Sequence, residues 1–260
     1  MKIAVCVKQV PDSETRITLP QPAAKLDRSA FTRVINPHDQ YAVEEAVKTK
    51  ERFAGSDITV ITVGPEAAVR EMIKKDCLAV GCDRAVVVAD AALDGADPLA
   101  IAEVLAAVLK RDAYDLILFG IKAIDDDSSQ VGAMVAELLG LPHVGYVSKL
   151  DLQEKELTAQ REIEGGKEIV ACALPAVLTC GKGLNEPRLP SLPNIMKAGA
   201  KPVDLLDCAK LGMAPPVSLT EIALYTPPPR RGACTMIPAD DPVAAARELA
   251  RRLHEEAKII

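Results

Sequence analysis

Short apolar runs alternate with amphipathic stretches over the first part of the chain. The runs are apolar on both faces, which is typical of buried parallel strands, and the predicted strands are residues 2–9, 57–63, 84–88, 115–119 and 144–147. Apolar residues recur at helical spacing between them, and the predicted helices are residues 36–50, 66–79, 97–110 and 131–139. This alternation implies right-handed crossovers and a parallel sheet. The predicted fold class is therefore α/β, with a Rossmann-like nucleotide-binding domain.

The pattern changes near residue 150, where alternation of apolar and polar residues replaces the helical spacing. Residues 157–163 alternate, a Gly-Gly turn follows, and residues 167–174 return, which predicts an added β-hairpin. Residues 176–180 predict one more strand. Residues 14–35 carry no helical period, so we expect a short hairpin or an excursion there.

Residues 183–198 contain three prolines and cannot form one regular element. Four apolar side chains in this segment suit a partner-binding loop, although they could also pack on the protein's own sheet. These residues are Leu189, Leu192, Ile195 and Met196.

The C-terminal part is predicted to be a linker followed by a helix. The linker is proline-rich, as in stiff connectors that cross onto another body. Asp241-Pro242 then begins a helix with an apolar face that must be buried, either on its own domain or on a partner chain. The expected organisation is a nucleotide-binding domain over 1–205, a linker over 206–240 and a helix over 241–260.

Four loops follow the carboxyl ends of predicted strands, where nucleotides bind in open parallel sheets, and they are residues 8–13, 36–39, 63–66 and 120–131. In the last loop, Asp127, Ser128 or Ser129 is expected to cap the next helix, whose free amides suit a phosphate. Neighbouring aspartates would repel that phosphate unless they point elsewhere, so a plain capped helix with a solvated acidic turn stays open. Asp125, Asp126 and Asp127 are adjacent, so their side chains diverge and no metal site is expected.

The helix over 36–50 is expected to begin with Asn36 as its cap and Pro37 in its first turn. Its pattern places Glu44, Glu45 and Lys48 on the water-facing side. A histidine, His38, lies at the helix start, where a surface position is favoured over a tuned acid.

Composition narrows the function. Hydrophobic residues make up 49% and charged residues 26% of the 260 residues, which indicates a globular chain. A net charge of -6 without a basic tract argues against nucleic acid as the main partner. The seven cysteines show no CxxC pairing and are expected to be small buried residues in a reducing compartment. No signal segment precedes the first strand and no apolar run could span a bilayer, so a cytoplasmic location is expected.

No catalytic set emerges from the motifs. The chain contains no nucleophile elbow, no GxGxxG fingerprint and no P-loop. We therefore predict no catalytic residues.

Six stretches carry a resemblance to one family, and they are residues 5–12, 36–46, 123–127, 161–166, 174–179 and 184–198. The longest and most specific runs from Leu184-Asn185-Glu186-Pro187-Arg188 to Leu192-Pro193-Asn194-Ile195-Met196-Lys197-Ala198. In this order, over residues 1 to about 200, the chain resembles the β subunit of electron-transfer flavoproteins. Beyond residue 205 the resemblance is one of plan, a linker and then a helix.

The resemblance implies a subunit that pairs with an α subunit, which holds most of a redox-active FAD, while this chain carries a structural AMP. The heterodimer would collect electrons from dehydrogenases, such as the acyl-CoA dehydrogenases of fatty acid β-oxidation, and pass them to a quinone-linked acceptor. The C-terminal helix would pack on the α subunit, and Leu192 would anchor to the partner dehydrogenase. By position, the implied cofactor-binding residues are Cys6, Asn36, Pro37, His38, Asp39, Val63, Gly120, Ile121, Lys122, Ala123, Ile124, Asp125, Asp126, Asp127, Ser128, Ser129, Gln130 and Val131.

Two features bear on which form of the family is present. Ser13 and His38 stand where some members place an aromatic residue beside the flavin, so a contact of His38 with the flavin is a hypothesis. A subset of the family binds FAD in place of AMP and splits electron pairs from NADH. Members of that subset generally lack the Asn185-Glu186-Pro187-Arg188 motif, and its presence here favours the AMP form.

Two other classes are alternatives. A standalone nucleotide-binding stress-type protein would leave loop 183–198 and the final helix without a purpose. An adenine-nucleotide hydrolase needs a glycine-rich loop near the first strand, which Lys8-Gln9-Val10-Pro11 does not supply.

Overall fold

The computed structural model describes residues 1–15, 31–216, 234–238 and 240–260. The chain divides into two compact units. The first comprises Met1–Ile17 with Asp27–Ile222, and the second comprises Thr18–Leu26 with Ala223–Ile260.

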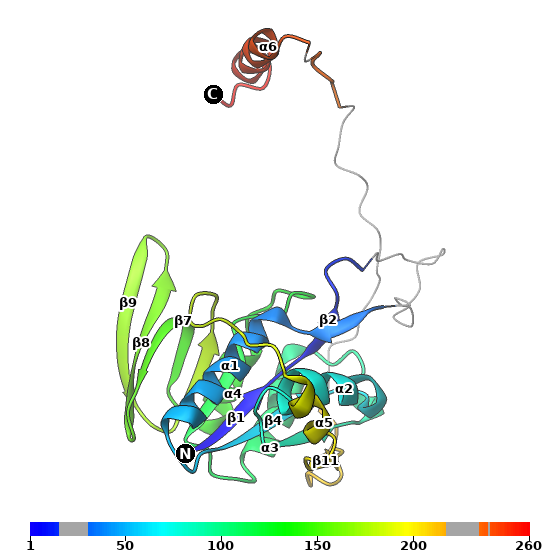
Figure 1. Cartoon of the computed structure of the whole chain (residues 1–260), viewed down its shortest axis with the longest axis vertical. Coiled ribbons are helices and arrows are strands. Elements are labelled where there is room, and N and C mark those ends of the chain that lie inside the picture. The colour runs from blue at the N-terminus through cyan, green and yellow to red at the C-terminus, as the bar shows by residue number, and fades with distance from the viewer. Residues whose placement is uncertain (16–30, 217–233, 239) are drawn as a thin grey trace. The chain divides into compact units, whose positions relative to one another are not determined.

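A mostly parallel sheet forms the centre of the first unit (Figure 1). Within the described residues its nine strands lie in the order β11-β5-β4-β1-β6-β10-β7-β8-β9. Their bounds are β1 Lys2–Cys6, β4 Asp57–Val63, β5 Arg84–Val88, β6 Leu116–Gly120, β7 His143–Leu152, β8 Glu156–Ile163, β9 Gly166–Ala173, β10 Ala176–Cys180 and β11 Val203–Leu206. Neighbours from β11 to β7 pair in parallel, and β7, β8 and β9 pair antiparallel. The predicted α/β class with an added hairpin is confirmed.

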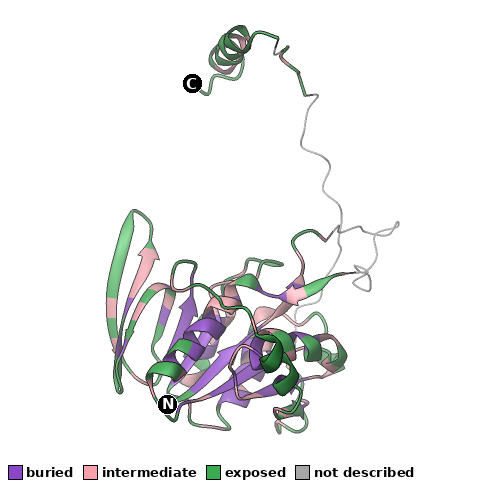
Figure 2. Cartoon of the chain, viewed as in Figure 1, coloured by how far each residue is buried: buried purple, intermediate pink, exposed green. Residues whose placement is uncertain are grey.

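Helices cover both faces of this sheet. The helical elements are α1 Pro37–Arg52, α2 Glu66–Met72, the π-helical turn η1 Ile73–Leu78, the 3-10 turn η2 Ala91–Leu93, α3 Pro98–Leu109, α4 Val131–Leu139 and α5 Leu192–Ala198. In β1, Ile3 and Val5 pack with the α1 and η1 side, and Ala4 and Cys6 pack with the α3 and α4 side. Each central strand thus faces apolar side chains above and below, which explains its continuous apolar run. Figure 2 shows burial concentrated in these central strands and in α1, and the β8–β9 hairpin more exposed.

The first predicted strand divides into two elements. The sheet strand β1 ends at Cys6, and a short antiparallel pair, β2 Gln9–Pro11 with β3 Arg33–Ile35, follows outside the main sheet. The chain leaves the sheet at Lys8, whose backbone N–H donates to the Asp39 carboxylate at 2.7 Å instead of to a neighbouring strand. Most of the predicted excursion over 14–35 lies outside the described residues.

The start of the predicted linker packs on the first unit. Strand β11 pairs with β5, and Leu206 and Cys208 are buried in the apolar cluster below the sheet. The backbone N–H of Cys208 also donates to Asp90 Oδ2 at 3.2 Å. Residues 217–233, the proline-rich core of that linker, lie outside the described residues.

The cysteines are all unpaired thiols. Cys6, Cys77, Cys82, Cys180 and Cys208 are buried, Cys172 is half-buried and Cys234 is exposed. Burial raises the pKa of the Cys82 thiol to about 12, which keeps it protonated and unreactive.

The second unit contains helix α6, Pro242–Glu255. Asp241 caps it as predicted, because its carboxylate accepts from the backbone N–H groups of Val243 and Ala244. Within the described residues of this helix none is buried, and Val243 and Leu249 on the apolar face are exposed. Ion pairs between residues four apart, such as Glu248 with Arg252, stabilise its polar side. No helix in the described part of the chain is long and apolar enough to cross a membrane.

Candidate functional site

The carboxyl ends of β1 and β6 meet the beginning of α1 at one buried carboxylate. Asp39 accepts hydrogen bonds from the backbone N–H of Lys8 (2.7 Å), from the backbone N–H of Gly120 (3.2 Å) and from Asn36 Nδ2 (2.8 Å). Asp39 is 5% exposed. Three of the four predicted strand-end loops are therefore joined through a single side chain.

Burial raises the pKa of Asp39 to about 7, although these three N–H donors favour its ionised form. Gly120 permits the contact, because a Cβ there would lie 2.7 Å from the backbone nitrogen of Asp39. The start of α1 and the end of β6 are thus fixed against each other.

Asn36 does not cap α1 with its side chain, contrary to the prediction. Its amide donates instead to Asp39 and to the backbone oxygen of Lys122 (2.8 Å), and its Oδ1 accepts from the backbone N–H of Ile124 (3.2 Å). A buried side chain with three hydrogen bonds, two of them to another loop, is worth more to the fold than one helix cap. Asn36 therefore shapes the segment 120–124, which begins the predicted phosphate loop.

The aspartates of this loop are paired with lysines. Lys8 Nζ contacts Asp125 Oδ1 at 2.8 Å and Asp126 Oδ2 at 2.9 Å, and Lys122 Nζ contacts Asp127 Oδ2 at 2.7 Å. Burial alone would lower the pKa of Lys8, but its hydrogen bonds to the two aspartates raise it above its usual value. The predicted repulsion of a phosphate is therefore reduced, because each carboxylate has a cation beside it.

The predicted caps of α4 are wrong. Asp127, Ser128 and Ser129 precede the helix without capping it, and Gln130 is the residue before its first turn. Asp127 (φ 57°) and Ser129 (φ 54°) lie in the left-handed region, which turns the loop sharply before the helix begins. Among the described residues no side chain hydrogen-bonds to the first-turn amides of α4, so the amide of Val131 and its neighbours are available to an anion.

The other implied cofactor residues differ in accessibility. Cys6 and Asp39 are buried, whereas Pro37, Asp125 and Gln130 are exposed. Val63 ends β4 at the same edge of the sheet, and Ile121 leaves β6 there, with its backbone N–H donating to the oxygen of Cys180 at 3.0 Å. Because its thiol is buried in the core, Cys6 can offer a ligand little more than its main chain.

His38 lies beside this loop and is half-buried. Its Nδ1 is buried and has no hydrogen-bond partner in the described part of the chain. Burial and the nearby Lys122 ammonium lower the pKa of His38, so the imidazole is neutral at neutral pH. A buried ring nitrogen without a partner is unusual in a folded protein, and it can accept or donate one hydrogen bond to a bound group.

Loop 183–198 presents four apolar side chains to solvent. Leu189, Leu192, Ile195 and Met196 are exposed, the first at 92%. Of the two alternatives for these residues, packing on the protein's own sheet is therefore wrong. The last residues of the loop form helix α5, which begins at Leu192 with Pro193 in its first turn.

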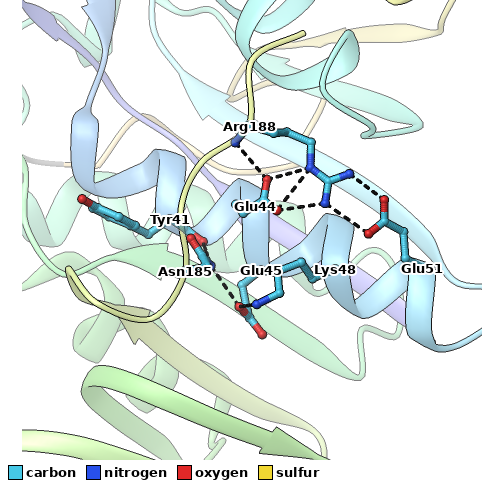
Figure 3. A network of polar contacts seen from close by, with 7 residues as sticks. All are labelled: Tyr41, Glu44, Glu45, Lys48, Glu51, Asn185 and Arg188. Atoms are coloured by element: carbon cyan, nitrogen blue, oxygen red, sulfur yellow. Dashed lines mark hydrogen bonds and ion pairs between the residues drawn. The ribbon is translucent and has the colours of Figure 1, made fainter. Parts of the chain in front are cut away.

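The sequence interpretation missed the anchors of this loop. Glu44 and Glu45, predicted to face water, are buried under it at 4% and 8% exposure. Arg188 and Asn185 from the loop bond to them, as Figure 3 shows. Two adjacent glutamates on one helix, matched by a distant arginine, are a signal of an ion pair, but sequence alone does not show which arginine reaches them.

Comparison with known proteins agrees with the α/β fold and identifies the family. The electron transfer flavoprotein domain matches residues 23–211. The chain is 38% identical over its whole length, and over the whole of the relative, to "Electron transfer flavoprotein subunit beta" of Bacillus subtilis. It is 35% identical to the human protein of the same name, over 96% of this chain and 98% of that one. It is also 35% identical to "Caffeyl-CoA reductase-Etf complex subunit CarD" of Acetobacterium woodii, over 98% of this chain and 99% of that one. The chain belongs to the electron transfer flavoprotein family, as one of its beta subunits.

Proposed function

We propose that this chain pairs with an α subunit and serves electron transfer from dehydrogenases to a quinone-linked acceptor through an FAD held mostly by that subunit. The chain itself holds an AMP with a structural role. The observation that carries the AMP assignment is loop 120–131, in which each aspartate is paired with a lysine and the helix that follows is uncapped.

The loop suits a phosphate that is bound but not transferred. It offers free amides at the start of α4 and hydroxyls at Ser128 and Ser129, and it places no activated nucleophile beside them. The left-handed residues Asp127 and Ser129 bend the backbone around this point. A nucleotide here would tie loop 120–131 to α4, as a stabilising ligand of the native state.

The fit to the flavin rests on His38. When bound, FAD supplies the electron chemistry, and the protein sets its position and surroundings. The buried Nδ1 of His38 lacks a partner within the described residues, and a flavin edge would give it one. The neutral imidazole would then orient the flavin through one hydrogen bond.

Two surfaces support the partner assignments. Helix α6 has an exposed apolar face, including Val243 and Leu249, which suits the α subunit. Loop 183–198 exposes Leu189, Leu192 and Met196, which suits an apolar pocket on a dehydrogenase. A carrier that serves several donors is expected to use a small apolar anchor of this kind.

The test is the nucleotide content of the complex. The chain is co-expressed with its α subunit, and the purified heterodimer is denatured and its released nucleotides are identified. One FAD and one AMP per heterodimer are expected. A complex without flavin, or a chain that stays a homodimer in the presence of the α subunit, contradicts the proposal.

A second candidate is a bifurcating complex, in which this chain binds FAD in place of AMP and NADH is oxidised. The similarity to the caffeyl-CoA reductase-Etf complex subunit over 98% of the chain favours it. The same experiment separates the two, because two FAD per heterodimer would replace the AMP assignment.

A further inference from the structure

A polar network ties loop 183–198 to the middle of α1 (Figure 3). Arg188 donates through Nε to Glu44 Oε2 at 2.9 Å, and through Nη2 to Glu44 Oε1 at 2.9 Å and Glu51 Oε2 at 3.1 Å. Its backbone N–H also donates to Glu44 Oε2 at 3.2 Å. One arginine thus bridges two carboxylates that lie about two turns apart on the same helix.

Asn185 makes a second attachment on the same side of α1. Its Nδ2 donates to the backbone oxygen of Tyr41 at 3.0 Å and to Glu45 Oε2 at 2.9 Å. The α1 residues that bind the loop recur at helical spacing and so form one stripe along the helix. They are Tyr41, Glu44, Glu45 and Glu51. The loop therefore lies along the helix and is not attached at a single point.

The two carboxylates contribute unequally. The Glu44 side chain is 6% exposed and that of Glu51 is 58% exposed. A buried carboxylate without its cation is strongly unfavourable, whereas an exposed ion pair adds little. The Arg188–Glu44 pair, with two parallel charge-assisted hydrogen bonds, is therefore the main tie.

The loop is fixed again at its far end. Ala198 is 1% exposed, and Lys201 Nζ donates to the backbone oxygens of Leu78 (2.8 Å) and Cys82 (2.6 Å) beside η1. Between the two attachments, Leu189 and Leu192 are 92% and 79% exposed. The apolar side chains are thus held outward between two fixed ends.

We propose that Arg188 is a positioning residue, which presets loop 183–198 in the conformation that docks an electron-donating dehydrogenase. This inference rests on the docking role proposed above for the loop. A loop that is already ordered loses less conformational entropy on binding, so its affinity is higher. Arg188 acts through the loop, and it touches neither loop 120–131 nor His38 in the described contacts.

The experiment uses the purified heterodimer as the electron acceptor of an acyl-CoA dehydrogenase from the same organism. The substitution Arg188→Ala is expected to raise the KM for the heterodimer about tenfold while kcat and nucleotide content stay unchanged. Arg188→Lys should restore part of the affinity, since a lysine ammonium cannot form the bidentate pair. The matched control is Arg52→Ala on α1. Arg52 pairs with Asp151 on β7 at 3.7 Å, so its removal tests the loss of an α1 ion pair outside loop 183–198.

A double-mutant cycle with Leu192→Ala decides whether Arg188 acts through the loop. Leu192→Ala alone should raise KM, and adding Arg188→Ala should raise it by less than about twofold more. Fully additive effects, a fall in kcat or a loss of nucleotide would overturn the proposal. If Leu192→Ala leaves KM unchanged, the docking role of the loop itself is wrong, whatever Arg188 does.

Discussion

Helix α1 holds two loops, and it holds them by different means. At its beginning, Asp39 and Asn36 bind loop 120–131 through hydrogen bonds to backbone groups of that loop. Farther along, Glu44 and Glu51 bind loop 183–198 through the guanidinium of Arg188. The first loop keeps backbone amides free, and the second keeps apolar side chains free. The free amides suit the nucleotide proposed for the first loop, and the free apolar side chains suit the protein partner proposed for the second.

The contrast predicts that protein stability depends more on the attachment of loop 120–131, which is made through the buried Asp39, than on exposed ion pairs. Asp39→Ala leaves the N–H donors of Lys8, Gly120 and Asn36 unpaired in the interior, so we expect a loss of about 4 kcal/mol in the free energy of unfolding. Urea denaturation measures it. Asp151→Ala, whose side chain is 65% exposed, is the control and should change stability by less than about 0.5 kcal/mol. Equal effects of the two substitutions would contradict the comparison.

The same carboxyl should make stability depend on pH. Its folded pKa of about 7 lies above the value of an unfolded aspartate, so proton binding stabilises the folded state. This contribution is complete below the unfolded pKa and is lost as the pH rises through the folded pKa, by about 1.4 kcal/mol per pH unit between them. Urea midpoints from pH 5 to 8 should fall more steeply for the native chain than for Asp39→Asn. Parallel curves would mean that Asp39 does not titrate in this range.

In the attachment of loop 183–198, the burial of each carboxylate should again decide how much its substitution lowers the free energy of unfolding. Glu44→Gln removes the charge that faces Arg188 in the interior and is expected to lower the free energy of unfolding by about 2 kcal/mol. Glu51→Gln removes an exposed partner of the same arginine and should lower it by less than about 0.5 kcal/mol. Chemical denaturation of the two variants under identical conditions provides the measurement. A larger effect at Glu51 would show that the exposed pair is the main tie.

The smallest expected change concerns the ligand and not the fold. Lys8→Met leaves Asp125 and Asp126 without their cation beside the proposed phosphate position, so the Kd for AMP should rise about tenfold. Calorimetric titration of the nucleotide-free heterodimer with AMP measures it. Lys149→Met on the exposed side of β7 is the matched control and should leave the Kd unchanged. If both variants bind like the native protein, the charge pairing does not serve a phosphate.

The sequence predicted the sheet better than the contacts of the loops. Apolar runs specify buried strands directly, so β1, β4, β5 and β6 were found within a few residues. The position of β10 between β6 and β7 was not found, because strand order depends on contacts far apart in the chain. Glu44 and Glu45 have the spacing of a solvated face, and only the loop folded over α1 buries them.

The caps failed for a related reason. Short polar residues before a helix usually cap it, but Asn36 has better partners in loop 120–131, and Asp127 is turned toward Lys122. Local propensity predicts what a residue does when nothing else competes for it. Around Asn36 and Asp127 other groups do compete, and the local rule gives the wrong partner.

The distribution of the cysteines has a practical consequence. Among the seven thiols, the one at Cys234 is exposed, and it precedes helix α6 in the second unit. A maleimide probe should therefore attach there first, since the buried thiols are shielded from reagents. A fluorophore on Cys234 would report, in real time and without substitution of any native residue, the binding of helix α6 to the α subunit proposed above.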